Sequence, residues 1–305
     1  MARAILGKYI QPSVLNRLTR LEFNPRQLVE GNLAGAHKSP FHGFAVEFAG
    51  HREYVPGDDL RHLDWKVYYR HDKHFIKQYE METNFVCHMM LDVSASMRYG
   101  QGDQQKLLYA SRMAATLGYL IIEQLDKVAL ATFDDRIREA LPPSNNLELI
   151  IRMSEVLDVT NPVEKTAIGP AVLELASRTG RRGIIILLSD FFVDLDDLAA
   201  ALQRLRYERH EVVLFQVMHH DEIDFRLPGM VRFEGLEEDE RFLTRPDDIR
   251  TAYLEACNRF RQRLETVCES NQCELVLCDT SRPMAELFAN YLQQRAIAGR
   301  RRWMR

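Results

Sequence analysis

The sequence predicts an α/β fold: a doubly wound, mostly parallel sheet with helices on both faces, preceded by a small β-rich N-terminal segment. Two observations lead to this fold class. After residue 85, continuous runs of valine, isoleucine and leucine alternate with helical patterns, and strands buried on both faces of a parallel sheet have this composition. Before that point, glycine and proline interrupt short runs of alternating polarity, a pattern typical of short β-strands.

The first predicted domain, residues 1–84, begins with a helix. Residues 12–22 carry apolar side chains at helical spacing, with a proline at the start. Residues 37–82 contain the alternating runs and form the β-rich segment.

The second predicted domain, residues 85–298, alternates strands with helices. Its expected strands and extended pieces cover 85–93, 127–133, 136–141, 183–190, 211–220 and 273–280. Its expected helices cover 104–124, 146–158, 168–179, 196–207, 247–270 and 284–297. The acidic stretch 233–244 predicts a hairpin, and residues 299–305 predict a frayed basic tail.

Composition limits the classes of partner. The chain of 305 residues has 40 basic and 44 acidic residues, a net charge of −4, which argues against non-specific binding of nucleic acid. No apolar run approaches the roughly 20 residues that span a bilayer. Five cysteines, an odd number, in a chain without an export signal predict a reducing, cytoplasmic location.

Oxygen-bearing side chains follow two of the predicted strands. Asp92 ends the first strand of the second domain and Asp190 ends another, while Ser94 and Ser96 follow Asp92 at alternate positions. Thr166 lies in a loop before a helix. Because ligands of open α/β sheets bind beyond the carboxyl ends of the strands, all five side chains are expected to meet at one edge.

Two carboxylates and three hydroxyls are ligands that hard divalent cations prefer, so the sequence predicts a site for Mg²⁺ or Mn²⁺. With only two acids, the ion would stay electrophilic and could accept a carboxylate from a partner protein. The alternative interpretation is that Ser94 and Ser96 only cap the next helix.

The set Asp92-x-Ser94-x-Ser96, with Thr166 and Asp190 downstream, resembles the metal-ion-dependent adhesion site of von Willebrand factor A domains. The resemblance implies that the serines and the threonine coordinate magnesium directly or through water. It also implies that the aspartates act largely through water, and that an acidic residue of a partner fills the open position.

The stretch "HKSPFHGFAVEFAGHREYVPGDDLRHLDW", residues 37–65, is similar to the signature of the "domain of unknown function 58" family. These bacterial proteins join such a segment to a von Willebrand factor A-like domain, and their genes commonly lie beside those of MoxR-type AAA+ ATPases. The resemblance therefore implies a MoxR-type ATPase as partner, with this chain as its adaptor or co-chaperone.

The segment "GDDLRHLDW" leaves two interpretations open. Asp58, Asp59, His62 and Asp64 could hold a second metal or act as acid and base. The structural interpretation, which we favour, has these acids paired with arginines and Trp65 filling a core.

Enzyme signatures are otherwise missing. The chain has neither a G-x-x-x-x-G-K-[ST] phosphate loop nor a G-x-S-x-G nucleophile elbow. We therefore expect a binding module rather than an enzyme. The alternative is a metal-dependent hydrolase that uses the same edge of the sheet.

Overall fold

The structure is a computed structural model, and it falls into two compact units: residues 1–27 together with 86–305, and residues 28–85. The residues that the structure describes are 2–18, 20–23, 25, 38–39, 47–54, 64–65, 67–68, 74–82, 85–160, 167–179, 182–235 and 241–303.

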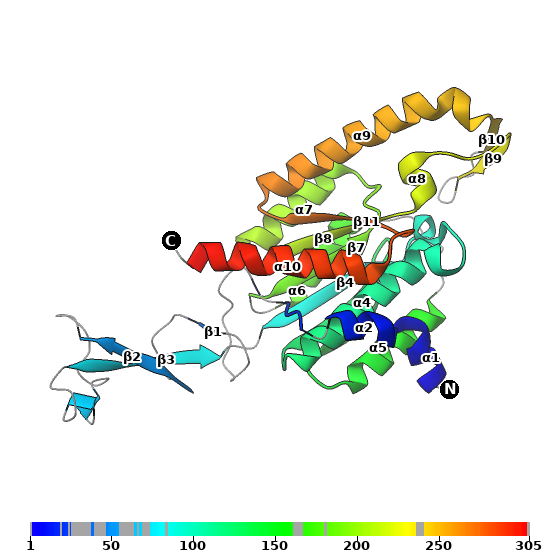
Figure 1. Cartoon of the computed structure of the whole chain (residues 1–305). Helices are drawn as coiled ribbons and strands as arrows, with labels where there is room; N and C mark the ends of the chain where they lie inside the picture. The colour runs from blue at the N-terminus through cyan, green and yellow to red at the C-terminus, as the bar shows by residue number, and fades with distance from the viewer. Residues whose placement is uncertain are drawn as a thin grey trace. The chain divides into compact units, whose positions relative to one another are not determined.

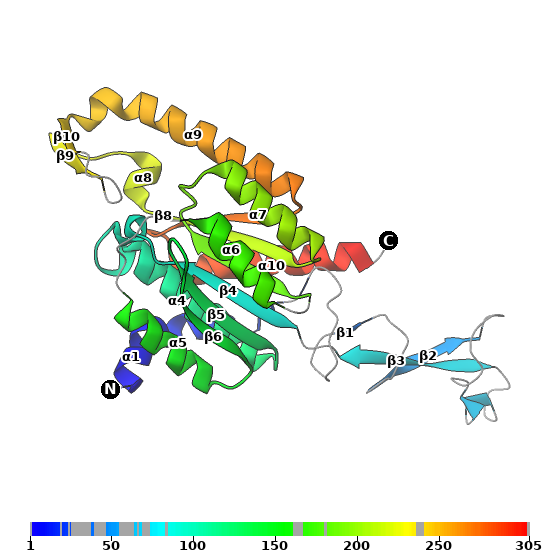
Figure 2. The ribbon, with the colours of Figure 1, turned by 180° about the vertical axis from the view of Figure 1, so that it is seen from behind.

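The larger unit is built on a six-stranded sheet in the order β11-β8-β7-β4-β5-β6 (Figures 1 and 2). Every neighbouring pair is parallel except β5 with β6, which is antiparallel at the edge. The strands are β4 (Val86–Asp92), β5 (Lys127–Phe133), β6 (Ile137–Ser144), β7 (Ile184–Ser189), β8 (Glu211–Met218) and β11 (Glu274–Asp279).

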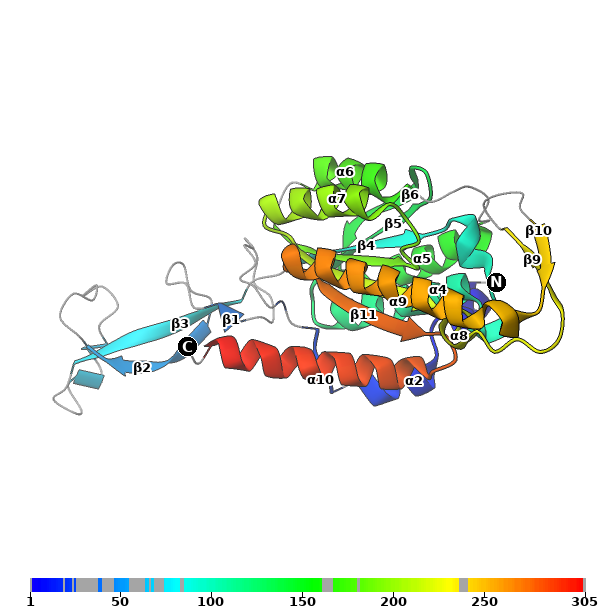
Figure 3. The same ribbon diagram turned by 90° about the horizontal axis from the view of Figure 1, so that it is seen from above.

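Helices cover both faces of this sheet, which confirms the predicted fold class (Figure 3). The first face packs its buried core against α6 (Ile168–Arg178), α7 (Leu195–Tyr207) and α9 (Pro246–Ser270). The other face carries α4 (Lys106–Glu123), α5 (Glu148–Val159) and α10 (Met284–Trp303), with α1 (Ala2–Tyr9) and α2 (Pro12–Leu18) packed against them. Strands β7 and β8 are buried along their whole length, which explains their largely apolar sequences.

Several shorter elements lie in the segments that follow β4 and β8. The helix α8 (His220–Asp224) follows β8, and the hairpin of β9 (Val231–Glu234) with β10 (Arg241–Thr244) follows α8. Two short 3-10 helices, η2 (Ala95–Arg98) and η3 (Gly102–Gln104), lie between β4 and α4. The hairpin was expected from the sequence, whereas α8 was not.

The smaller unit contains the predicted β-rich segment. Its strands β1 (Lys38–Ser39), β2 (Glu47–Glu53) and β3 (Phe75–Glu82) form an antiparallel sheet in the order β1-β3-β2. The pairing of β2 with β3 shifts register between Phe48 and Gly50.

The chain differs from the sequence-based expectation at both ends. An additional helix, α1, precedes the expected one, and α2 ends at Leu18. Helix α10 continues to Trp303, so the predicted frayed tail is wrong for residues 299–303. The arginines there are good helix formers, and positive charge is favourable at a helix C-terminus. Among the described helices, none is long and apolar enough to cross a membrane.

Candidate functional site

Asp92 is the last residue of β4, a central strand, and its side chain is fully buried. One carboxylate oxygen, Oδ1, accepts a hydrogen bond from the backbone N–H of Ser94 at 2.8 Å. The other, Oδ2, accepts one from the Ser189 hydroxyl at 2.5 Å. Because Ser189 ends the adjacent strand β7, Asp92 joins the ends of two parallel strands.

The two serines that follow Asp92 turn their hydroxyls toward each other. The oxygens of Ser94 and Ser96 lie 3.1 Å apart. Neither side chain caps a helix through a hydrogen bond: Ser94 is the N-cap of η2 and makes no side-chain cap bond. The geometry therefore does not support the interpretation of Ser94 as a capping residue.

Asp190 follows Ser189 at the end of β7, so it lies at the same edge of the sheet as Asp92. Its Oδ1 accepts the backbone N–H of Phe192 at 3.2 Å. The intervening residue, Phe191, is buried and has a positive φ of 58°. A bulky residue rarely adopts this conformation, which concentrates backbone strain beside the candidate ligand.

A lysine also reaches this edge. Lys106, the first residue of α4, donates to Asp190 Oδ2 at 2.8 Å and to Glu222 Oε1 at 2.9 Å. Its side chain is 1% exposed. Burial by itself would lower the pKa of the Lys106 ammonium, but the charges of Asp190 and Glu222 outweigh burial and raise that pKa above its ordinary value.

The carboxyl group of Asp92 has an unusual proton affinity. Burial, and after it the negative charge of Asp190, raise the pKa of Asp92 to about 7. The hydrogen bonds from Ser189 and Ser94 act in the opposite direction. Two buried carboxylates at one edge favour a bound cation, because a cation offsets their mutual repulsion.

The hydrogen-bonded hydroxyls of Ser94 and Ser96 have a spacing compatible with two ligands of a magnesium ion. Magnesium binds oxygen octahedrally at 2.0–2.1 Å, so two adjacent ligands lie about 2.9 Å apart. The 3.1 Å between the hydroxyl oxygens of Ser94 and Ser96 is close to that separation. A bound divalent ion would polarise an incoming oxygen ligand. Ser94 and Ser96 would hold the ion, and Asp92 and Asp190 would offset its charge.

The structure brings four of the five predicted site residues to one edge: Asp92, Ser94, Ser96 and Asp190. The fifth, Thr166, lies outside the described residues. Ala167, which follows it, donates its backbone N–H to the carbonyl oxygen of Asp134 at 2.8 Å. Asp134 immediately follows β5, the other neighbour of β4.

The second candidate cluster is only partly described. Asp58, Asp59 and His62 lie outside the described residues. Asp64 is buried, and its carboxylate accepts the backbone N–H of Val67 at 3.4 Å, as a turn residue does. The expectation that Trp65 fills a core is wrong: its side chain is 58% exposed and packs edge-on against Tyr68.

Sequence reasoning missed Ser189, Lys106 and Glu222. Lys106 did carry a signal, because a basic residue at the first position of a helix is unfavourable for the helix dipole and needs a local acidic partner. Glu222 belongs to a capping box on α8, in which its Oε2 accepts the backbone N–H of His219.

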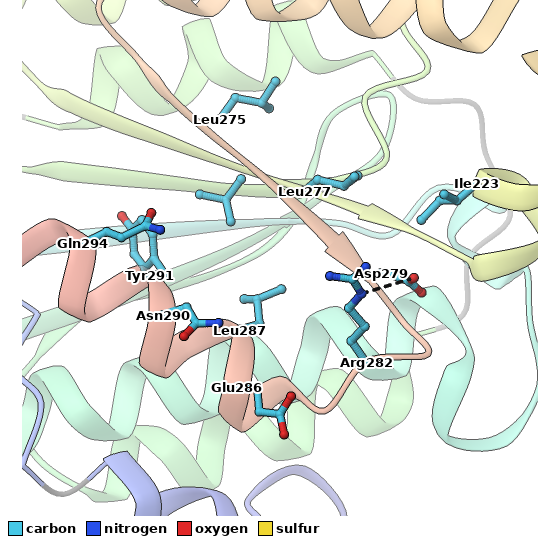
Figure 4. A pocket seen from close by; sticks show the side chains of 11 residues that line it. Ile223, Leu275, Leu277, Asp279, Arg282, Glu286, Leu287, Asn290, Tyr291 and Gln294 are labelled. Atoms are coloured by element: carbon cyan, nitrogen blue, oxygen red, sulfur yellow. Dashed lines mark ion pairs between the residues drawn. The ribbon is translucent and has the colours of Figure 1, made fainter. Parts of the chain in front are cut away.

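A separate pocket of about 440 Å³ lies between β11 and α10 (Figure 4). Leu275 and Leu277 of β11 and Leu287 of α10 contribute apolar walls, and Asp279 and Arg282 lie at one end. Beside this pocket, Asp279 accepts from the Ser281 hydroxyl at 2.7 Å and contacts His220 Nδ1 at 3.2 Å. Hydrolytic triads place the histidine between the serine and the acid, whereas here the acid is in the middle.

The chain is similar in sequence and in structure to known proteins. The chain is 24% identical over 227 residues to the uncharacterized protein Rv1480 of Mycobacterium tuberculosis, covering 73% of this chain and 70% of the relative. Among solved structures, it resembles the conserved hypothetical protein BatB of Bacteroides thetaiotaomicron, with 16% identity and a TM-score of 0.47. That match covers 71% of this chain and 100% of the other.

The VWA domain of SpRpn10 is a further structural neighbour, with 13% identity and a TM-score of 0.40 over 68% of this chain and 94% of the other. The family model described as "Protein of unknown function DUF58" matches residues 50–263. This range is more than half of the chain, and the protein therefore belongs to the DUF58 family.

Proposed function

We propose that this protein is a metal-dependent protein-interaction module. A magnesium or manganese ion at the carboxyl edge of the sheet, held through Asp92, Ser94, Ser96, Thr166 and Asp190, binds an acidic residue of a partner. The protein then acts as an adaptor or co-chaperone of a MoxR-type AAA+ ATPase.

One observation carries the proposal. The hydroxyls of Ser94 and Ser96 lie 3.1 Å apart, next to two buried carboxylates from adjacent strands. That spacing suits two neighbouring ligands of one octahedral ion. Neutral hydroxyls leave the charge of the ion incompletely offset, so a carboxylate from outside gains a strong electrostatic partner.

The residues at this edge of the sheet fit a role in binding better than a role in hydrolysis. Hydrolysis would require a nucleophile and a general base within hydrogen-bond reach of each other. The Lys106 ammonium is already paired with two carboxylates, and Asp92 accepts two hydrogen bonds. The partner ATPase is inferred from the resemblance to MoxR-associated proteins.

The test is retention of the MoxR-type ATPase of the same genome on the immobilised protein. We expect retention by the wild type in magnesium, loss in chelator and recovery when magnesium is restored. The double change Ser94→Ala, Ser96→Ala should abolish retention with little loss of stability, because these two hydroxyls contact each other. Thermal unfolding with and without magnesium should show a metal-dependent shift only in proteins that keep the site.

The matched control is Ser177→Ala, which removes an exposed hydroxyl on α6. It should behave as the wild type. Retention that ignores the chelator and the double change would overturn the adaptor mechanism. A phosphoester or peptide substrate turned over by the wild type and not by the double variant would establish the hydrolase alternative instead.

A further inference from the structure

We propose that Lys106 is a built-in counter-cation that keeps the metal-loaded site able to accept an acidic partner. The inference rests on the proposed function and assigns a role to a residue that the adhesion-type ligand set does not include. Lys106 acts through Asp190 and Glu222, and it is therefore a positioning residue.

The ammonium group of Lys106 is held firmly in place. Its two charged partners lie at 2.8 Å and 2.9 Å, and they come from the end of β7 and from α8. The backbone N–H of Lys106 donates to the carbonyl oxygen of Tyr99, at 3.0 Å. The ammonium also lies 6.0 Å and 5.7 Å from the ring centroids of Tyr99 and Phe192. Because the side chain is almost fully buried, water screens its charge weakly.

This charge has two opposite effects at the site. A fixed positive charge beside Asp190 repels a divalent ion and weakens its binding. The same charge attracts an incoming carboxylate. Lys106 therefore lowers the affinity for metal and raises the affinity of the loaded site for an acid.

Counting charges shows how much depends on the lysine. With every group ionised, Asp92, Asp190, Glu222 and Lys106 carry two net negative charges, which one divalent ion brings to neutral. Without the lysine, the loaded site keeps one negative charge and repels an acidic ligand. The lysine therefore raises the affinity of the loaded site for a carboxylate.

The experiment measures Mn²⁺ affinity by titration calorimetry, at about pH 8 so that the carboxylates are ionised. Lys106→Met should bind Mn²⁺ roughly tenfold more tightly than the wild type, and Glu222→Gln should bind it several-fold more weakly. Lys106→Arg keeps the charge and should stay close to the wild type. A purely structural role predicts losses of affinity in both Lys106→Met and Glu222→Gln, so the opposite signs are diagnostic.

A second readout uses acetate as the carboxylate probe. In the Mn²⁺-loaded wild type, acetate should displace water from the ion and lower the water-proton relaxation enhancement. In Lys106→Met the same decrease should require several-fold more acetate. Should Lys106→Met not fold, Glu222→Gln supplies the opposite signs by itself. It should bind Mn²⁺ more weakly but need less acetate than the wild type, because its loaded site has one negative charge fewer, whereas a structural loss predicts weaker binding of both.

The outcomes separate the two proposals. If the wild type binds no Mn²⁺, the metal site itself is absent and the proposed function fails with it. If the wild type binds Mn²⁺ and takes up acetate, but Lys106→Met matches it in both, the metal site stands and the role of Lys106 is overturned. Equal weakening in Lys106→Met and Glu222→Gln would also overturn it.

Discussion

Two buried cations stand at opposite ends of the parallel sheet, and each bridges two carboxylates. At the carboxyl end, Lys106 joins Asp190 to Glu222. At the amino end, Arg295 of α10 joins Glu211, the first residue of β8, to Glu274, the first residue of β11. Both cationic side chains are 1% exposed.

The two clusters differ in what surrounds the cation. The Arg295 guanidinium contacts the two acids, the Tyr291 hydroxyl at 3.2 Å and the ring of Phe23, whose centroid lies at 4.5 Å. The planar fork of arginine suits such a fixed arrangement. Exposure does not separate the clusters, because Glu222 keeps 17% and Glu274 keeps 14% of the side chain exposed. The Lys106 cluster differs in its position, because its Asp190 belongs to the proposed metal site. Similar charges thus form a structural cluster at one end of the sheet and adjoin the proposed metal site at the other.

The largest expected effect comes from removing the arginine. Arg295→Met leaves Glu211 and Glu274 without their shared cation, and breaking a buried ion pair in this way costs about 3–5 kcal/mol of unfolding free energy. Urea unfolding monitored by circular dichroism measures it. Arg259→Met, an exposed residue with a 4.0 Å ion pair, is the control and should change little.

Adding magnesium should affect the two variants differently. It should restore part of the stability lost in Lys106→Met, because the ion can replace the missing positive charge there. It should restore none of the stability lost in Arg295→Met. Rescue of the arginine variant, or an arginine variant as stable as the wild type, would contradict the distinction between a structural cluster and one that adjoins a metal site.

Acid should lower the unfolding free energy of the protein through His88. Burial, and secondarily the nearby His210, lower the pKa of His88 in β4 from 6.5 to about 4. The unfolded chain therefore binds a proton that the folded chain excludes, and the contribution of His88 to stability declines as the pH falls from 6.5 to 4.

Urea unfolding at several values in this pH range should give a steeper loss for the wild type than for His88→Gln. The difference in slope should be at most about 1.4 kcal/mol per pH unit. Carboxylates also titrate in this range, so the readout is the difference between the two proteins. Parallel curves would show that His88 is not held neutral by the fold.

The smallest expected effect concerns a buried hydroxyl in α4. The Thr116 hydroxyl in α4 is buried and makes no hydrogen bond to the described residues. Thr116→Val removes it at nearly constant shape, and the protein should gain up to about 1 kcal/mol in unfolding free energy. Ser154→Ala is the contrast, because Ser154 donates to the carbonyl oxygen of Ile150 at 2.8 Å and its loss should not stabilise. A destabilised valine variant would indicate a partner for Thr116.

The sequence was sufficient for the sheet and for most of the site. Asp92 and Asp190 each end a run of apolar residues, and parallel strands end at one edge, so their proximity could be predicted from spacing alone. The strands β4, β7 and β8 were found because their sequences are mostly apolar. These predictions use local patterns and one general rule of topology.

The rest depends on pairings between distant residues. Lys106 is 84 residues from Asp190 and 116 from Glu222, and no local pattern indicates which acid a lysine will meet. The short helix α8 was missed because its five residues, His220–Asp224, contain one apolar side chain and show no periodicity. The strained backbone of Phe191 follows from the turn between β7 and α7, which apolar patterning does not specify.

The larger unit is built from two separate stretches of the chain, residues 1–27 and 86–305, and this has a consequence for biosynthesis. Helix α2 packs against α10, and the Phe23 ring covers the Arg295 guanidinium, although about 270 residues of chain separate these partners. On the ribosome, the apolar face of α2 is made long before the helix that covers it. The closing contact must therefore form after elongation of the intervening chain, and until then Leu18 and Phe23, both fully buried in the finished fold, are without that cover.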